Sequence, residues 1–272
     1  PVMLRLATRL AHSRAAVRAA GRRAPNLANW APDPERFTLV PVNARRAYAG
    51  LVDKQAALQD WSQAHDVNRL EIRGAGRPGI LVSGIAWNYL VEALGERLAD
   101  YNLLRIGTYP LPIEKIRSLL QASSVVHVVE EGYPFIERFV SALGLMREPR
   151  ILGKLTGDLP RLGELSQDAI KRCFGLPVAP ALQLAGLADV LVARPPRLCD
   201  KCPHTDAYVA IKEVIAAMGD GVRVMGDIGC YSLGALEPLQ AIHSCLCMGS
   251  SIGMAIGAAH AGMTPALCVI GD

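Results

Sequence analysis

Aromatic residues are scarce in this chain, at 5% of 272 residues, whereas it contains 25 glycines and 18 prolines. This composition disfavours an all-β sandwich and favours an α/β protein built from aliphatic strands and tight turns. Hydrophobic residues make up 51% and charged residues 20%. A chain of this kind can bury a sizeable core, and its length suits about two domains of ~100–200 residues each.

Acidic residues are absent from positions 1–32, and the first 46 residues hold nine arginines against Asp33 and Glu35. The net charge of +4 therefore arises in this segment, because the remaining chain is three units negative. A segment of this kind can imitate an organellar transit peptide or contact nucleic acid, but no DNA- or RNA-binding module accompanies the arginines. We therefore favour a domain interface and expect no nucleic-acid partner.

Charged residues are also missing from Ser244 to Gly271, a stretch long enough to cross a membrane. Its glycines, His260 and Pro265 divide it into a helix and a strand, so we expect a buried α/β core and no membrane contact. The sequence shows no signal peptide and contains seven cysteines. This combination favours a reducing compartment, the cytoplasm, where thiols serve as ligands or core residues.

Strands and helices alternate from Gly79 onward. The predicted strands cover Ile80–Ser83, Leu103–Gly107 and Val125–Glu130, and the predicted helices cover Asn88–Leu98, Ile113–Leu120 and Pro134–Leu143. This alternation predicts right-handed crossovers and a parallel sheet. A helix at Val42–His65 precedes the series. Residues 146–180 follow as a connector, since they lack clean periodicity apart from a short helix at Ser166–Cys173.

The last fifty residues read as strand, loop, helix and strand. One apolar run ends at Gly226–Asp227, small residues dominate a helix within Cys247–Gly257, and a second run ends at Gly271–Asp272. A glycine-rich turn that enters a helix lets backbone amides approach a phosphate, and an aspartate at a strand end can hold Mg²⁺. A tight turn with glycine-assisted helix packing explains the same spacing.

Cysteine spacing points to a metal. Cys199 and Cys202 are separated by two residues, and Cys230 follows the next predicted strand. The alternatives are an iron–sulfur cluster, a zinc site with His204, and free or packed thiols. The other four cysteines have apolar neighbours and are expected to be small core residues: Cys173, Cys245, Cys247 and Cys268.

The catalytic residues are unknown from the sequence. His204, His243 and His260 are all candidates for proton transfer, although a lone histidine more often has a structural role, and only His204 lies in a motif. Glu130 and Glu131 fall at a strand end, where capping of the next helix or a domain interface is favoured over acid–base catalysis.

Four motifs carry a resemblance to a known family: Cys199-Asp-Lys-Cys-Pro-His204, Gly226-Asp-Ile-Gly-Cys-Tyr-Ser-Leu-Gly234, Glu237-Pro-Leu and Cys247-Met-Gly-Ser-Ser-Ile-Gly253. Together they resemble the thiamine-diphosphate domain of the indolepyruvate:ferredoxin oxidoreductase α subunit. The match continues through Gly79–Tyr89 and Tyr109–Pro112, so it covers nearly the whole chain. His243–Ser244 is a departure, because the family usually has an Asp–Thr pair there.

The resemblance implies an α/β fold with two doubly wound parallel-sheet domains. Residues 1–45 would be the exit segment of a pyrimidine-type domain and a linker, and residues 46–150 a domain similar to the transketolase carboxyl-terminal domain. Residues 151–180 would connect it to the amino-terminal part of an incomplete thiamine-diphosphate-binding domain at 181–272. On this interpretation the chain is an interior fragment that is inactive alone.

The resemblance also implies a site and an activity. The pocket for thiamine diphosphate would be lined by Gly226, Asp227, Gly229, Cys230, Met248, Gly249 and Ser250. Asp272 would be a Mg²⁺ ligand, and Cys199, Cys202 and Cys230 would bind a [4Fe–4S] cluster. The activity would be oxidative decarboxylation of arylpyruvates to aryl-acetyl-CoA, with a β subunit and ferredoxin as partners and coenzyme A as co-substrate. The alternatives are another thiamine-dependent 2-oxoacid oxidoreductase and a non-catalytic scaffold.

Overall fold

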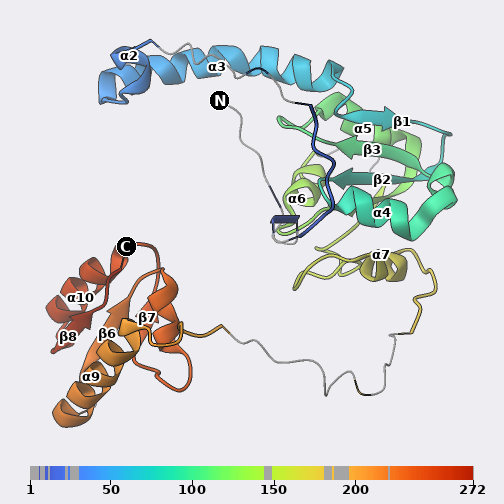
Figure 1. Cartoon of the computed structure of the whole chain (residues 1–272). Coiled ribbons are helices and arrows are strands. Elements are labelled where there is room, and N and C mark those ends of the chain that lie inside the picture. Colours follow the sequence, from blue (N-terminus) through green and yellow to red (C-terminus); the bar gives the residue numbers. More distant parts are fainter. Residues whose placement is uncertain are drawn as a thin grey trace. The chain divides into compact units, whose positions relative to one another are not determined.

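The chain forms two compact units, Pro1–Ala181 and Leu182–Asp272, each with its own sheet (Figure 1). The computed structural model describes residues 6, 10–11, 13–21, 24, 31–143, 149–180, 186, 196–219 and 221–271. The five-stranded sheet of the first unit is mostly parallel, and the three-stranded sheet of the second is parallel throughout. The predicted α/β class with two mostly parallel sheets is thus confirmed, whereas the likeness to the transketolase domain stays a prediction.

The sheet of the first unit has the strand order β1-β3-β2-β4-β5. Only β1 runs antiparallel to its neighbour, and β2 lies at the centre between β3 and β4. The strands are β1 (Arg69–Glu71), β2 (Arg77–Ser83), β3 (Asn102–Ile106), β4 (Ser123–Val129) and β5 (Arg150–Leu152). The helices that follow β2, β3 and β4 are α4 (Ala86–Leu94) with the 3₁₀ helix η1 (Gly95–Asp100), α5 (Ile113–Ala122) and α6 (Phe135–Ser141).

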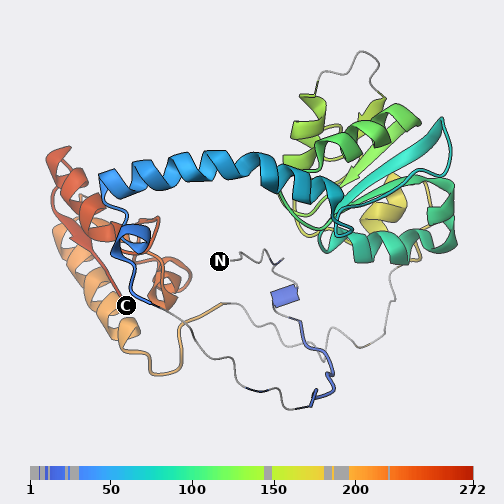
Figure 2. The ribbon, with the colours of Figure 1, turned by 90° about the horizontal axis from the view of Figure 1, so that it is seen from above.

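Alternating side chains send the strands' apolar residues into two separate cores. Ile80 and Val82 of β2 pack with α4 and with α7 (Gln167–Cys173). Leu81 of β2 packs on the other side with Ile116 of α5 and Ile136 of α6. Helices therefore cover both faces of this sheet (Figure 2). A strand buried on both faces has a continuous apolar sequence, which explains why β2 and β4 were predictable.

Residues 151–180, predicted to be a connector, belong to the first unit. Leu159, Leu165 and Ile170 are buried in the same core as α4, and β5 extends the sheet beside β4. These residues bury apolar side chains without a regular period, so periodicity could not reveal them. A second difference is at Gly95, where φ is +52°. The predicted helix Asn88–Leu98 is therefore divided into α4 and η1.

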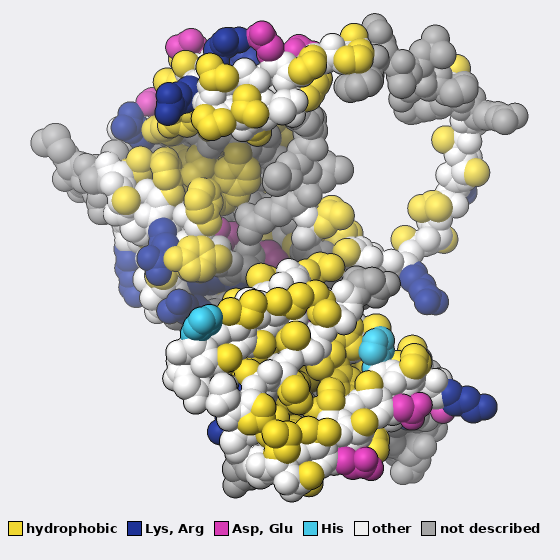
Figure 3. Space-filling view, turned by 90° about the vertical axis from the view of Figure 1, so that its left-hand side faces the viewer, with side chains coloured by type: hydrophobic (Ala, Val, Ile, Leu, Met, Phe, Trp, Pro, Cys, Tyr) yellow, Lys and Arg dark blue, Asp and Glu magenta, His cyan; other side chains and the backbone are white. Residues whose placement is uncertain are grey.

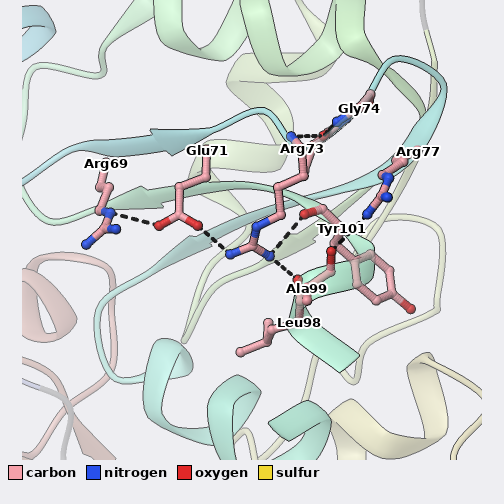
Figure 4. Close-up of polar contacts among 9 residues, drawn as sticks. Arg69, Glu71, Arg73, Gly74, Arg77, Leu98, Ala99 and Tyr101 are labelled. Carbon is pink, nitrogen blue, oxygen red and sulfur yellow. Dashed lines mark hydrogen bonds and ion pairs between the residues drawn. The ribbon is translucent and has the colours of Figure 1, made fainter. Parts of the chain in front are cut away.

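A polar network closes the amino end of this sheet (Figure 4). The fully buried Asn102 accepts hydrogen bonds from the backbone amides of Arg73 and Gly74, at 2.8 and 3.1 Å. The Arg73 guanidinium donates to the carbonyl oxygens of Leu98 and Tyr101 and pairs with Glu71. The guanidinium therefore ties the segment before β2 to the end of η1 and to the residue that follows it.

The longest helix, α3 (Pro41–Ala64), lies before the first strand (Figure 2). It follows the short helix α2 (Pro34–Phe37) and has proline in its first turn, where the missing N–H costs nothing. Its last turns are tied to the α/β core, since Gln59 Nε2 donates to Leu111 O at 2.7 Å and Ser62 Oγ donates to Pro110 O.

The second unit has the strand order β7-β6-β8. Its elements are α9 (Pro203–Met218), β6 (Arg223–Gly226), the 3₁₀ helix η2 (Cys230–Ala235), β7 (Ser244–Cys245), α10 (Ser250–His260) and β8 (Ala266–Cys268). Its core contains Tyr208, Tyr231, Ala241 and Ile242. Helix α10 packs on β6 and β8. No helix in the described part of the chain is both long and apolar enough to cross a membrane.

The uncharged stretch from Ser244 to Gly271 is far less buried than predicted. Within α10, Ser251 and Ala255 are buried, whereas Ile252 and Ile256 are exposed. Hydrophobic side chains gather on a broad exposed surface of the second unit, in the lower part of Figure 3. The prediction of core cysteines at 245, 247 and 268 is also wrong, because all three are exposed. Part of the apolar surface of α10 is therefore uncovered in the described part of this unit.

Candidate functional site

The candidate site is built around Asp227, which follows β6 and is completely buried. Its Oδ1 accepts a hydrogen bond from the Tyr231 hydroxyl. Its Oδ2 accepts from the Gly249 amide at 2.8 Å and from Ser251 Oγ at 3.2 Å. The carboxylate therefore ties the end of β6 to the first turn of α10.

These hydrogen bonds hold Asp227 in its charged form. The hydrogen bond from Tyr231, with those from Gly249 and Ser251, lowers the pKa of Asp227 despite its burial. The backbone amide of Ser251 also donates to this carboxylate. An internal anion thus occupies the amino terminus of α10, where free amides and the helix dipole favour negative charge. These contacts cap α10; the predicted contact of Asp227 with thiamine diphosphate stays a prediction.

Two buried tyrosines, Tyr231 and Tyr208, connect the Asp227 carboxylate to α9. Tyr208 Oη donates to the backbone carbonyl of Tyr231 at 2.6 Å. Burial raises the pKa of Tyr208 to about 12, with smaller effects from Tyr231, Cys230 and Cys202. Both phenols therefore stay protonated near neutral pH and act as hydrogen-bond donors.

The predicted pocket glycines serve different purposes. A side chain at Gly226 would place its Cβ 2.8 Å from Ile242, and one at Gly229 would overlap the ring of Tyr231. These two glycines allow close packing inside the unit. Gly249 has open space at its Cβ position but a φ of +78°, so it is required for its left-handed backbone conformation. Close packing therefore explains the glycines at 226 and 229, and backbone conformation explains Gly249.

The remaining predicted pocket residues are Met248, in the loop before α10, and Cys230 and Ser250, the first residues of η2 and α10. Met248 is 70% exposed and Cys230 is also exposed. Ser250 Oγ donates to Cys247 O at 2.7 Å and accepts from the Cys247 amide at 3.2 Å, which closes a local turn. Asp272 lies outside the described residues. Its predecessor Gly271 is described and lies against the ring of Tyr231.

The Cys199–His204 motif contacts Tyr231 through His204. Cys202 Sγ is 3.4 Å from His204 Nδ1, and the His204 ring lies 5.6 Å from the ring of Tyr231. The Cys202 amide donates to Cys199 O, forming a turn. Within the described ranges, no group of three or more His, Cys, Asp or Glu side chains could hold a metal ion. Cys199, Cys202 and Cys230 all belong to these ranges and do not form such a group. Their role as ligands of a cluster or of zinc stays a prediction.

Of the two adjacent carboxylates in the first unit, Glu130 caps a helix, which is one of the roles favoured from the sequence. Glu130 accepts hydrogen bonds from the amides of Ile136 and Glu137 at 2.9 and 3.0 Å, in the first turn of α6. Glu131 Oε1 accepts from the Leu165 amide at 3.2 Å. These contacts hold the start of α6 and the 153–165 segment against the end of β4.

Three residues of the site were missed from the sequence: Tyr208, Tyr231 and Ser251. Tyr231 lies in the glycine-rich motif four residues after Asp227, and a tyrosine flanked by glycines was the available signal. Ser251 adjoins the predicted Ser250. Tyr208 is distant in sequence from the rest, and no local pattern points to it.

Comparisons with curated proteins give relatives that share one description. Indolepyruvate oxidoreductase subunit IorA of Methanothermobacter thermautotrophicus is 36% identical over 281 residues, covering 100% of this chain and 46% of the relative. The subunit of the same name from Archaeoglobus fulgidus is 31% identical, covering 100% and 45% respectively. That from Thermococcus kodakarensis is 29% identical, covering 94% and 42%. The chain thus spans a little under half the length of these relatives.

No family model matches the chain, and no solved structure gives a significant match. The similarity extends across both units, since the first two relatives cover the whole chain. The resemblance predicted from the motifs is therefore confirmed: this chain is related along its entire length to the indolepyruvate oxidoreductase subunit IorA.

Proposed function

We propose that this chain is part of a larger subunit that carries out ferredoxin-dependent oxidative decarboxylation of arylpyruvates, yielding aryl-acetyl-CoA. The observation that supports it is the similarity to subunit IorA along the whole chain. The proposed partners are a β subunit and ferredoxin, the co-substrate is coenzyme A, and the proposed location is the cytoplasm. Nucleic acid and membrane have no part in the proposal.

Thiamine diphosphate would bind where β6 and β8 end. These strands are parallel neighbours, with Met225 paired to Cys268, so Asp227 and Gly271 follow them at the same edge of the sheet. Ligands of open α/β sheets bind at this edge. A carboxylate at Asp272 has the hard oxygen that Mg²⁺ prefers. When bound, thiamine diphosphate would supply the electron sink for loss of carbon dioxide.

Each residue near that edge has a supporting role in the proposal. Asp227 holds the loop before α10, and Cys230, Met248 and Ser250 present exposed or half-buried groups from the neighbouring loops. His204 is the candidate for proton transfer near Tyr231. Cys199, Cys202 and Cys230 are proposed as ligands of a [4Fe–4S] cluster, with zinc bound together with His204 as the alternative.

The test is made on the full-length subunit assembled with its partner under anaerobic conditions. Calorimetry measures Mg²⁺-dependent binding of thiamine diphosphate, and ferredoxin reduction is followed with indolepyruvate, phenylpyruvate, pyruvate and 2-oxoglutarate in parallel. We expect binding and a preference for arylpyruvates. Preference for an aliphatic acid would support a different 2-oxoacid oxidoreductase, and no response to thiamine diphosphate would support a scaffold.

A matched pair of variants locates the metal. Asp272→Ala should weaken Mg²⁺-dependent binding strongly, because it removes the proposed carboxylate ligand. Glu131→Ala should leave binding unchanged, because Glu131 lies in the first unit and contacts Leu165. Wild-type affinity in the Asp272 variant would refute the assignment of this strand end as the metal site.

A further inference from the structure

The ring of Tyr231 lies between the two Gly–Asp strand ends of the second unit. A Cβ atom built at Gly229, in the loop after β6, would overlap this ring, and so would one built at Gly271, after β8. Both segments therefore approach the same aromatic ring as closely as a glycine allows. Tyr231 is 2% exposed, so the ring fills the space between them completely.

The hydroxyl of Tyr231 makes a polar link across the same gap. It donates to Oδ1 of Asp227 and accepts a hydrogen bond from the backbone of Gly271. The bond to Asp227 raises the pKa of Tyr231, and the bond from Gly271 acts in the opposite direction. One phenol oxygen thus joins the Gly226–Asp227 strand end to the strand end that leads into Asp272.

Other contacts hold Tyr231 itself in place. Tyr208 of α9 donates to its backbone carbonyl at 2.6 Å, and Asp227 is fixed by Gly249 and Ser251. Because Asp227 already satisfies amides at the start of α10, an external diphosphate gains little there. The strand end after β8 is then the place where a cation and its diphosphate would be held.

We propose that Tyr231 is a positioning residue, which sets the spacing between the two strand ends and so places the segment leading into Asp272 for binding of a divalent cation. The identity of the ligand rests on the proposed function; the link between the strand ends does not. Tyr231 touches neither substrate nor cofactor in this assignment and acts through Gly271 and Asp227.

The experiment compares Tyr231→Phe with Tyr208→Phe in the full-length subunit assembled with its partner. Each change removes one buried hydroxyl and keeps the ring, but only Tyr231 bonds to Asp227 and Gly271. Electron paramagnetic resonance with Mn²⁺ as the probe measures cation affinity in the presence of thiamine diphosphate, and amide hydrogen exchange measures protection at Gly271. We expect roughly tenfold weaker Mn²⁺ binding and faster exchange at Gly271 in Tyr231→Phe. Tyr208→Phe removes only the bond to the backbone carbonyl of Tyr231 and should have the smaller effect on both.

The outcomes separate this inference from the proposed function. If the wild-type protein binds Mn²⁺ with thiamine diphosphate and Tyr231→Phe binds equally well, the positioning role is overturned. If both variants lose affinity equally, the Tyr231 hydroxyl acts only through stability, and the role is again overturned. If the wild-type protein binds neither, the proposed function fails, and exchange at Gly271 alone decides whether Tyr231 links the strand ends.

Discussion

The two units of the chain bury their side chains in different ways. The first covers both faces of its sheet with helices and fills two apolar cores. The second has three short strands, a small core with two tyrosines, and many exposed apolar side chains. Aliphatic packing holds the first unit, whereas a polar connection among Asp227, Tyr231 and Tyr208 organises the second. Stability and site geometry should therefore respond to different substitutions in the two units.

The largest expected effect is in the core of the first unit. Ile80→Ala removes a completely buried side chain and should lower the free energy of unfolding by about 2–5 kcal/mol. Ile256→Ala, on the exposed side of α10, should change it by less than about 0.5 kcal/mol. Urea unfolding followed by tryptophan fluorescence reports on the first unit, because all three tryptophans lie there, and amide hydrogen exchange within α10 reports on the second. Equal losses of unfolding free energy in the two variants would contradict the proposed difference in burial between the two units.

The next effect distinguishes two glycines of the second unit. Gly229→Ala would force a methyl group into the ring of Tyr231 and should destabilise this unit by about 1–3 kcal/mol. Gly253→Ala is the control, since its Cβ meets open space within α10. It should stabilise the helix by roughly 0.5–1 kcal/mol. Thermal unfolding followed by circular dichroism measures both changes, and a stable Gly229 variant would contradict the packing described for Tyr231.

The third prediction uses carboxylates whose pKa values shift in opposite directions. Burial raises the pKa of Glu130 above its ordinary value of 4.5. The folded first unit therefore retains the proton longer, and the contribution of Glu130 to stability falls as pH rises from 4.5 through the folded pKa. The Tyr231 hydrogen bond lowers the pKa of Asp227 below 3.8. Its stabilising contribution is present above pH 3.8 and is lost as pH falls through the folded pKa.

Substitution of each carboxylate by its amide tests whether Glu130 and Asp227 cause these pH dependences of stability. Glu130→Gln should flatten the pH dependence of unfolding of the first unit above pH 4.5, measured by tryptophan fluorescence. Asp227→Asn should flatten that of the second unit below pH 3.8, measured by amide hydrogen exchange. A slope that persists in the Asn variant would assign the acid sensitivity of the second unit to another group.

The smallest effect concerns the network at the amino end of the first sheet. Arg73→Ala removes two bonds to carbonyls and a pairing with Glu71 from a side chain that is 30% exposed, and should cost about 1 kcal/mol. Arg69 also pairs with Glu71 but is 71% exposed, so Arg69→Ala should be nearly neutral. Urea unfolding compares the two. An equal cost would mean that the carbonyl contacts of Arg73 contribute nothing.

The same contrast explains what could be predicted from the sequence. Continuous aliphatic runs located β2, β3, β4, β6 and β8. The strands β1, β5 and β7 have two or three residues and lie in no such run, whereas the equally short β8 lies within the apolar run 265–270. The segment 151–180 escaped recognition because its apolar residues bury at irregular spacing. Periodicity reports regular burial, so it succeeded where an element has a long covered face.

The site shows a different limit. Its motif identified Asp227 and Gly249, which the structure brings together. The motif could not separate a glycine that admits phosphate from one that admits an aromatic ring, as at Gly229. The role of Tyr231 depends on Gly271, forty residues later in the chain. Contacts between such distant residues leave no local pattern.

The attachment of α3 has a mechanical consequence. Its 24 residues rise ~1.5 Å each, giving a rod about 36 Å long. The hydrogen bonds described between this helix and the α/β core come from Gln59, Ser62 and Gln63, near one end. The helix is therefore attached near one end, at residues 110–115, which include the start of α5. A rotation of the helix by about 10° about this attachment would displace its first residue, Pro41, by roughly 6 Å. A small change in orientation near Pro110 would therefore cause a large displacement at Pro41.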